Sequence, residues 1–373
     1  MTDSKKISRR SFSIGLTAAT AVTLASPHVA RAAAGLDPLI GNMLLLGFLG
    51  SDGLASWAQR LARQISLGQV GGAVFLGHNF KSRGGVTALT QMFESAGNGS
   101  RPLVMLDQEG GAVQRLGKKL GYTSIPRARE VARDMSPKQA KALYAGLAGD
   151  VRGAGFNFNL APVVDMEVDP TNPVIGKWGR AWGNDPKTVT TYATAFIDAH
   201  HGEGLACSLK HFPGHGSSRG DSHDGFVDIT DTWTRAELKP FEALAGSGVA
   251  DAVMTAHLYH RDFAGSTDEP VTLSHTAIES VLRGELGFRG TVMTDDLDMG
   301  AIRSRYSLEE AVVRAIAAGN DLVMLSNSAK PDDNLPSRMI ETVKAAVTDG
   351  RISRARIEQA AQRIAALKGR ISV

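Results

Sequence analysis

The chain has 373 residues, a formal net charge of +3 and a single cysteine, Cys207. A single cysteine excludes a disulfide within the chain. The first 32 residues carry five basic residues against one acidic residue, a net of +4, which leaves about −1 for the rest of the chain. The basic character therefore belongs largely to the N-terminus, and the charge gives no case for a nucleic-acid partner.

The N-terminal residues have the features of an export signal. A twin arginine, Arg9-Arg10, follows a basic start, and a mildly apolar run extends over residues 14–25. The small-residue segment at 30–32 then provides a cleavage site. A basic tail or a short membrane anchor is the alternative, but the apolar run is too short to span a bilayer. We expect residues 1–32 to be a twin-arginine signal, which predicts a periplasmic or secreted protein without stable membrane insertion after signal removal.

Eight short apolar runs recur along the rest of the chain, and helical patterns separate them. The runs are Met43–Gly47, Ala73–Gly77, Leu103–Asp107, Phe156–Val164, Ala206–His211, Ala252–His257, Thr291–Asp295 and Leu322–Ser326. Two helices have capping signals, Ser136 with Gln139 and Ser307 with Glu310. Continuous apolar strands that alternate with helices indicate a parallel sheet covered on both faces. Eight units in this length favour one α/β domain over residues 33–373, a single (β/α)₈ TIM-type barrel, over an open doubly wound sheet.

Ionisable side chains stand at the ends of five consecutive predicted strands, the third to the seventh. They are Asp107 and Glu109, Asp165, Lys210 and His211, His257, and Asp295 and Asp296. Barrel active sites are built at the C-terminal ends of the strands. Any one of these residues could be a helix cap or a satisfied buried group, but five strands with the same feature indicate an active site.

The glycine-rich segment after the fifth strand carries a candidate acid/base pair, because Asp221 and His223 lie two residues apart in it. An aspartate beside an imidazole can orient it and raise its basicity. The seventh strand ends abruptly at Asp295, as in barrel enzymes that place a nucleophile at a strand tip. Together these features predict acid/base-assisted covalent catalysis, although His223 taken alone could be an ordinary surface histidine.

A metal site is the main chemical alternative, since His211, His215, Asp221 and His223 lie within thirteen residues. A barrel metal hydrolase would use His and Asp ligands at its strand ends. The first predicted strand, Met43–Gly47, lacks the His-x-His pair of that enzyme class. We therefore expect no metal and no cofactor.

Five segments from about Met43 to the C-terminus occur in the order of one known family. They are Asp107–Arg115, Asn159–Asp165, Asn172–Gly176, Lys210–His223 and Leu282–Leu297. The chain resembles glycoside hydrolase family 3, of the single-domain bacterial β-N-acetylhexosaminidase type. The Lys210–His223 segment is the most specific, because its fixed spacing includes both members of the Asp-x-His pair. The resemblance implies a retaining, exo-acting enzyme that removes terminal β-linked N-acetylglucosamine from peptidoglycan- or chitin-derived glycans.

The resemblance also implies a role for individual residues. Asp295 matches the nucleophile, His223 the general acid/base, and Asp221 the partner that orients the imidazole. Five further residues match positions that hold the hydroxyls of the terminal sugar: Asp107, Arg115, Arg180, Lys210 and His211. Arg180 follows the Ile175-Gly176 pair later than the family pattern has it, as if two residues were inserted.

Only 78 residues follow Asp295 in the chain, too few for the second domain from which many β-glucosidases of this family take their acid/base. We therefore expect the barrel itself to supply this group, as in the hexosaminidase type. A barrel-only β-glucosidase of other sugar specificity and a non-catalytic periplasmic sugar-binding protein are the alternatives. The expected partner is a carbohydrate substrate, and we expect a monomer.

Overall fold

The computed structural model of the protein describes residues 1, 35–264 and 268–371. Apart from Met1, the predicted export signal at residues 1–32 lies outside the described residues, so it stays a prediction. Within the described ranges, no helix is both long enough and apolar enough to cross a membrane.

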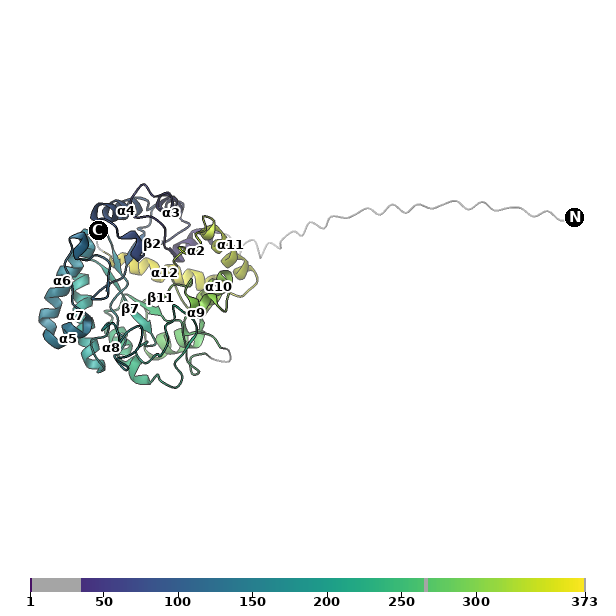
Figure 1. Cartoon of the computed structure of the whole chain (residues 1–373). Helices are drawn as coiled ribbons and strands as arrows, with labels where there is room; N and C mark the ends of the chain where they lie inside the picture. Colours follow the sequence, from purple (N-terminus) through teal and green to yellow (C-terminus); the bar gives the residue numbers. More distant parts are fainter. Residues whose placement is uncertain (2–34, 265–267, 372–373) are drawn as a thin grey trace.

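Eight parallel strands form the centre of the domain, and helices form a ring around them (Figure 1). The strands are β1 (Leu44–Leu46), β2 (Gly72–Phe75), β3 (Leu103–Leu106), β6 (Phe158–Asn159), β7 (Ala206–Phe212), β9 (Ala252–Thr255), β11 (Thr291–Thr294) and β12 (Val323–Leu325). Their order in space is β11-β9-β7-β6-β3-β2-β1-β12, and a parallel bridge between Met293 and Leu322 joins the two end strands. The fold is therefore a single (β/α)₈ barrel, and each predicted strand overlaps an observed one.

Apart from α2, which precedes β1, the helices come after strands in chain order, and helices cover the outside of the barrel. They are α2 (Asp37–Met43), α3 (Ser56–Ser66), α4 (Arg83–Ser95), α5 (Ala128–Asp134), α6 (Pro137–Gly153), α7 (Pro186–Gly202), α8 (Lys239–Ser247), the π-helix η5 (Thr276–Glu285), α9 (Gly300–Arg303), α10 (Leu308–Ala318), α11 (Leu335–Thr348) and α12 (Arg354–Arg370). Both predicted caps are confirmed. Ser136 Oγ accepts a hydrogen bond from Gln139 N at 3.4 Å, and Ser307 Oγ accepts one from Glu310 N at 3.1 Å.

The strand residues are buried on both faces, because helices cover the outside and side chains fill the inside. Every residue of β2, β3, β9 and β11 is buried. Parallel register places residues of neighbouring strands at the same level, so Met254 of β9 lies beside Met293 of β11. The carboxyl ends of the strands therefore meet at one end of the barrel, where the predicted site residues follow them.

The predicted strand over residues 156–164 is longer than the observed one, since β6 covers only Phe158–Asn159. Beyond β6 the chain still runs beside β7, through a parallel bridge between Val163 and Lys210. Pro162 interrupts the ladder because it has no N–H to donate. The segment is therefore extended and close to β7, but it forms a regular strand over two residues only.

Short elements in the connections complete the carboxyl end of the barrel. Two small sheets are formed there, β4 (Gln108–Gly110) with β5 (Val113–Gln114), and β8 (Val227–Asp228) with β10 (Leu258–Tyr259). The 3₁₀ turns are η1 (Gly77–Asn79), η2 (Lys118–Leu120), η3 (Arg235–Leu238) and η4 (Val271–Leu273). The periodicity of the sequence did not predict these elements, which are too short to have a hydrophobic pattern of their own.

Candidate active site

The carboxyl ends of the strands surround a cavity of about 160 Å³. Seven of the eight predicted site residues line it: Asp107, Arg115, Arg180, Lys210, His211, His223 and Asp295. The eighth, Asp221, lies behind the lining and is hydrogen-bonded to His223. The remaining lining residues are Glu109, Val113, Val174, His215, Ser222, Met254 and Met324. The fold thus brings together predicted site residues that are up to 188 positions apart in the sequence, from Asp107 to Asp295.

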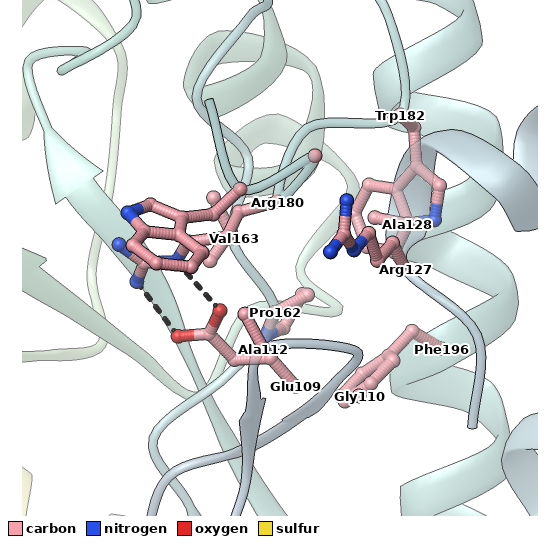
Figure 2. Close-up of a pocket in the computed structure, with 12 residues that line it drawn as sticks. Glu109, Gly110, Ala112, Arg127, Ala128, Pro162, Val163, Arg180, Trp182 and Phe196 are labelled. Carbon is pink, nitrogen blue, oxygen red and sulfur yellow. Dashed lines mark hydrogen bonds and ion pairs between the residues drawn. The ribbon is translucent and has the colours of Figure 1, made fainter. Parts of the chain in front are cut away.

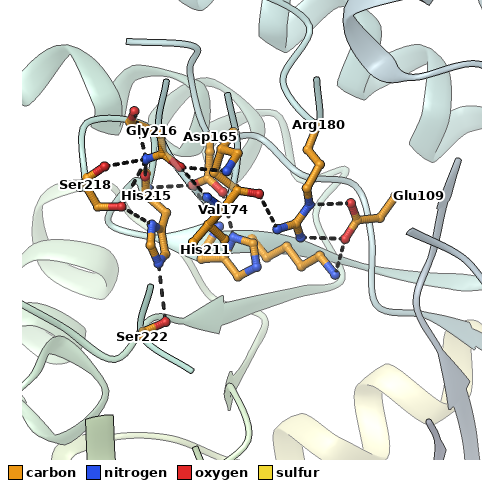
Figure 3. Close-up of polar contacts among 12 residues, drawn as sticks. Glu109, Asp165, Val174, Arg180, His211, His215, Gly216, Ser218 and Ser222 are labelled. Carbon is orange, nitrogen blue, oxygen red and sulfur yellow. Dashed lines mark hydrogen bonds and ion pairs between the residues drawn. The ribbon is translucent and has the colours of Figure 1, made fainter. Parts of the chain in front are cut away.

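Four charged side chains form one wall of this cavity. Lys210 Nζ lies 2.6 Å from Asp107 Oδ1 and 2.7 Å from Glu109 Oε1. Arg180 binds both carboxylate oxygens of Glu109, with Nε and Nη2 each at 2.8 Å (Figure 3). This bidentate geometry holds the guanidinium plane in one orientation. The wall therefore presents fixed charged groups that can bind sugar hydroxyls.

The charges of this wall stabilise one another. Burial acts to raise the pKa of Glu109, but the Arg180 and Lys210 cations outweigh it and hold that pKa below its usual value. Burial acts to lower the pKa of Lys210, and the carboxylates of Asp107 and Glu109 outweigh it and raise that pKa. Glu109 and Lys210 are therefore both charged at neutral pH.

Glu109 is a member of the wall to which the sequence analysis assigned no role. It lies two residues after Asp107 in the same motif, so the motif was the signal that could have identified it. In the segment between Gly176 and Arg180 that carries the expected shift, Lys177 and Trp178 are exposed, and Arg180 lines the cavity. The shift therefore leaves Arg180 in the cavity.

A much smaller hollow of about 10 Å³ lies on the other side of the Arg180–Glu109 pair. Figure 2 shows this pair at one side of the hollow and Arg127, Trp182 and Phe196 at the other. A volume of this size holds about one water molecule. The candidate substrate site is therefore the cavity that the predicted site residues line, and not this hollow.

Asp165 organises the start of the segment that follows β7. Its Oδ1 accepts hydrogen bonds from His211 N at 3.0 Å and His215 N at 2.8 Å, and its Oδ2 lies 2.6 Å from His211 Nδ1 (Figure 3). Burial acts to raise the pKa of Asp165, but His211 outweighs it and lowers that pKa. A carboxylate at this place holds Nδ1 of His211 in its protonated form, so Nε2 is the nitrogen left for other contacts. The sequence placed Asp165 at a strand end without assigning it a role.

The two aspartates after β11 have different environments. Asp295 lines the cavity, whereas Asp296 accepts hydrogen bonds from Asp298 N at 3.0 Å and Ser326 N at 2.9 Å. Desolvation acts to raise the pKa of Asp295, but the neighbouring imidazoles, His257 first, outweigh it and lower that pKa. Burial raises the pKa of Asp296 to about 6. Of the pair, Asp295 is thus the carboxylate that lines the cavity and has the lower pKa.

His223 lies at the mouth of the cavity with its side chain 65% exposed. Asp221 Oδ1 accepts a hydrogen bond from His223 N at 2.9 Å and lies 2.7 Å from His223 Nδ1. Burial acts to raise the pKa of Asp221, and these hydrogen bonds outweigh it and lower that pKa. The carboxylate therefore holds the ring through Nδ1 and leaves Nε2 free to exchange a proton with a substrate or with water.

The histidines of the metal alternative each have a protein partner. His211 and His223 contact Asp165 and Asp221, and His215 Nδ1 lies 2.7 Å from Ser218 Oγ. Burial lowers the pKa of His215 to about 4. Among the residues that the structure describes, no group of three His, Cys, Asp or Glu side chains is arranged to hold a metal ion.

Comparison with known proteins gives a consistent result. Residues 36–367 match the family model described as "Glycosyl hydrolase family 3 N terminal domain". The chain is 36% identical over 325 residues to a protein named Beta-hexosaminidase from Stenotrophomonas maltophilia (strain K279a), which covers 84% of this chain and 91% of that protein.

Two solved structures show the same similarity in three dimensions. A β-N-acetylhexosaminidase from Beutenbergia cavernae superimposes with a TM-score of 0.80 at 29% identity, over 90% of this chain and 98% of that one. A glycoside hydrolase family 3 β-N-acetylglucosaminidase from Paenibacillus sp. has a TM-score of 0.79 at 33% identity. It is longer, so that the match covers 90% of this chain but 62% of that one.

Proposed function

The chain belongs to glycoside hydrolase family 3 and is a glycoside hydrolase of hexosaminidase type, and from this premise we propose that it is a retaining, exo-acting β-N-acetylhexosaminidase. Its substrate would be a peptidoglycan- or chitin-derived glycan with a terminal β-linked N-acetylglucosamine. The observation that carries the proposal is the meeting of Asp295 and His223 in one cavity with a wall of charged residues. The cavity is smaller than the roughly 300 Å³ at which typical small-molecule pockets begin, which favours one terminal sugar unit.

In the first step of the proposed reaction, a carboxylate oxygen of Asp295 attacks the anomeric carbon. The bond from this carbon to the leaving oxygen breaks, and His223 gives its Nε2 proton to that oxygen. The lowered pKa of Asp295 supports this role, because a nucleophile must be ionised at neutral pH. The products of the step are the free aglycone and a glycosyl ester on Asp295.

In the second step, neutral His223 takes a proton from water, and the hydroxide attacks the anomeric carbon and releases Asp295. Retaining glycosidases usually use two carboxyl groups for these roles. Here an imidazole would replace one of them, and Asp221 would stabilise its protonated form. A histidine suits this purpose near neutral pH without the raised pKa that a carboxyl acid needs.

The sugar hydroxyls would be held by the charged wall. Asp107 and Glu109 can accept hydrogen bonds from the sugar hydroxyls. Lys210 and Arg180 can donate hydrogen bonds to the oxygens of those hydroxyls. Because these four groups already bind one another, they keep their positions before the substrate arrives. Such pre-organisation supports tight selection of one sugar in one orientation.

A labelling experiment tests the proposal. The purified protein would be treated with a slow fluorinated N-acetylglucosaminide, digested and analysed by mass spectrometry. We expect a covalent glycosyl adduct on the peptide that contains Asp295, at Asp295 itself. An adduct on Asp296 would move the nucleophile by one residue, and no adduct with no turnover would favour a non-catalytic sugar-binding protein. A parallel panel of chromogenic β-glycosides separates the sugar specificities, since faster turnover of the glucoside would favour the β-glucosidase alternative.

We also propose that the protein is exported by the twin-arginine route, on the basis of Arg9-Arg10 and the small residues at 30–32. Replacement of both arginines by lysine should leave unprocessed protein in the cytoplasm, because the transport machinery reads the arginine pair. Cell fractionation followed by N-terminal sequencing measures this outcome. Normal yields of processed protein outside the cytoplasm would contradict the assignment.

A further inference from the structure

A buried glutamate outside the cavity holds the segment that leads to the proposed acid/base. Glu237 lies in η3, directly before α8, and is 1% exposed. Its Oε2 accepts hydrogen bonds from Gly216 N at 3.0 Å and Ser217 N at 3.3 Å. Its Oε1 is buried and has no hydrogen-bond partner among the described residues. The carboxylate is thus committed to two backbone amides of a neighbouring loop.

The glycines of this loop allow the close approach to Glu237. Gly214 has a φ of +120°, and a Cβ on it would lie 2.7 Å from Cβ of Glu237. A Cβ on Gly216 would lie 1.8 Å from the carbonyl oxygen of Met166. No other residue fits at either position without moving the loop. The loop is therefore built to pack directly against the carboxylate.

A chain of polar contacts connects these amides to the acid/base. Ser217 precedes Ser218, whose Oγ lies 2.7 Å from His215 Nδ1, and His215 Nε2 lies 3.4 Å from Ser222 Oγ (Figure 3). Ser222 is the residue immediately before His223. A displacement at the Glu237 end of the loop would therefore be transmitted to the position of the imidazole.

The loop is held at the other end by Asp165, which binds the amides of His211 and His215. Two buried carboxylates thus share one loop. Burial raises the pKa of Glu237 to about 7, and the charge of Asp165 adds to this against the hydrogen bonds from Ser217 and Gly216. The charged group that acts on Glu237 from the packed segments is Asp165, in the segment after β6. His211 and His215 are hydrogen-bonded to Asp165. On its own 3₁₀ helix, Arg235 is paired with Glu285.

We propose that Glu237 is a positioning residue for the acid/base, which fixes the 214–222 segment through the amides of Gly216 and Ser217 and so places His223 at the cavity. The proposal rests on the proposed function, because it takes His223 to be the acid/base. Glu237 touches no substrate atom in this scheme, since it does not line the cavity. Its effect should appear only where proton transfer by His223 limits the rate.

The test compares Glu237→Ala and Glu237→Gln with a surface control, Glu242→Gln. Glu242 is an exposed glutamate of the adjoining helix, paired with Lys239. The readout is kcat/KM on N,N′-diacetylchitobiose, which has a poor leaving group, and on the dinitrophenyl N-acetylglucosaminide, which hardly needs protonation. Unfolding curves measured on the same samples correct each value for the folded fraction.

We expect Glu237→Ala to lose about tenfold or more on the disaccharide, at most the roughly 10²–10⁴-fold that a general acid/base contributes, and little on the dinitrophenyl substrate. Glu237→Gln should recover only part of the loss, because the amide oxygen can still accept both N–H groups but lacks the charge of the carboxylate. Glu242→Gln should match the wild type on both substrates. Equal losses on the two substrates, or no loss for Glu237→Ala, would overturn the proposal.

The pH profile gives a second readout that does not depend on the alanine variant folding. The ionised carboxylate is the stronger acceptor, so disaccharide hydrolysis by the wild type should weaken as the pH falls through about 7, where Glu237 gains its proton. A glutamine at position 237 cannot gain a proton, so the activity of Glu237→Gln should not show this acidic limb, the fall in rate below a pH of about 7. Glu242→Gln should keep the acidic limb of the wild type. An unchanged limb in Glu237→Gln would contradict the proposal.

The same assay on His223→Ala separates this inference from the proposed function. If His223→Ala has the leaving-group dependence of the wild type, the acid/base assignment fails, and the positioning role fails with it. If His223→Ala shows the expected difference between the substrates and Glu237→Ala does not, only the role of Glu237 is wrong.

Discussion

Two aspartates, Asp321 before β12 and Asp295 after β11, lie at opposite ends of the barrel. They differ in how many hydrogen bonds and ion pairs their carboxylate oxygens form. Asp321 lies before β12, at the amino end of the barrel, and is fully buried. It accepts a hydrogen bond from Val292 N at 3.0 Å. Three guanidinium groups also bind it at 2.8–3.1 Å, those of Arg283, Arg356 and Arg363.

Asp295 follows β11 at the carboxyl end, where the cavity opens. Among the described residues, its side chain has one hydrogen bond, from Asp296 N at 2.8 Å. Both aspartates lie next to the end of a barrel strand. The oxygens of Asp321 accept from four donors, whereas Asp295 lines the cavity and has an oxygen available there. The number of engaged partners therefore separates a structural carboxylate from one that is available for chemistry. Substitution of Asp295 should therefore affect mainly turnover, and substitution of Asp321 mainly stability.

The largest effect is expected for Asp295→Asn. An amide cannot act as the nucleophile, and loss of a catalytic nucleophile typically costs on the order of 10⁴–10⁶-fold in kcat. Stability should change little, because Asp295 has few partners to lose. Steady-state kinetics and chemical denaturation on the same preparation measure both quantities. If Asp295→Asn unfolds more easily by several kcal/mol while its turnover per folded molecule persists, the two aspartates do not differ as we infer.

His223→Ala should cause the second largest loss of turnover, mainly on substrates with poor leaving groups. A general acid/base contributes about 10²–10⁴-fold. We expect a loss of that size on N,N′-diacetylchitobiose and a much smaller one on a dinitrophenyl glycoside, whose leaving group needs no proton. Asp221→Asn should give a weaker form of the same pattern, because the ring keeps its place but loses a charged partner. A leaving-group plot that is the same for wild type and His223→Ala would assign the acid/base elsewhere.

Asp321→Asn should give the opposite result to Asp295→Asn, with a loss of stability and little change in turnover. Removing one partner of a buried ion pair costs about 3–5 kcal/mol, because the remaining charge stays buried without its counterion. We expect a loss of stability of this size in urea denaturation, with kcat per folded molecule near that of the wild type. Asp349→Asn is a matched control, since Asp349 forms an exposed pair with Arg351 and such pairs contribute about 0–1 kcal/mol. Equal stability losses in the two variants would remove the distinction that the comparison rests on.

Local sequence pattern was enough to predict the strands, the helix caps and one hydrogen bond of the site. Apolar runs of strand length, separated by helical patterns, predicted eight strands and a closed barrel, because alternation along the chain directly sets the layers. The caps at Ser136 and Ser307 were predictable because each involves residues three positions apart. The spacing of Asp221 and His223 likewise predicted their hydrogen bond.

Contacts between distant residues of the site could not be predicted in this way, because they depend on the closed barrel. The pair of Arg180 with Glu109 joins residues 71 positions apart, and Lys210 meets Asp107 across 103 positions. No local period encodes such distances, since they depend on the closure of the barrel. For the same reason the sequence did not identify Asp165 as the anchor of the segment after β7, or Glu237 as its neighbour. Partners of this kind are set by which loops meet at the carboxyl ends of the strands, and that follows from strand order and register rather than from the residues of one segment.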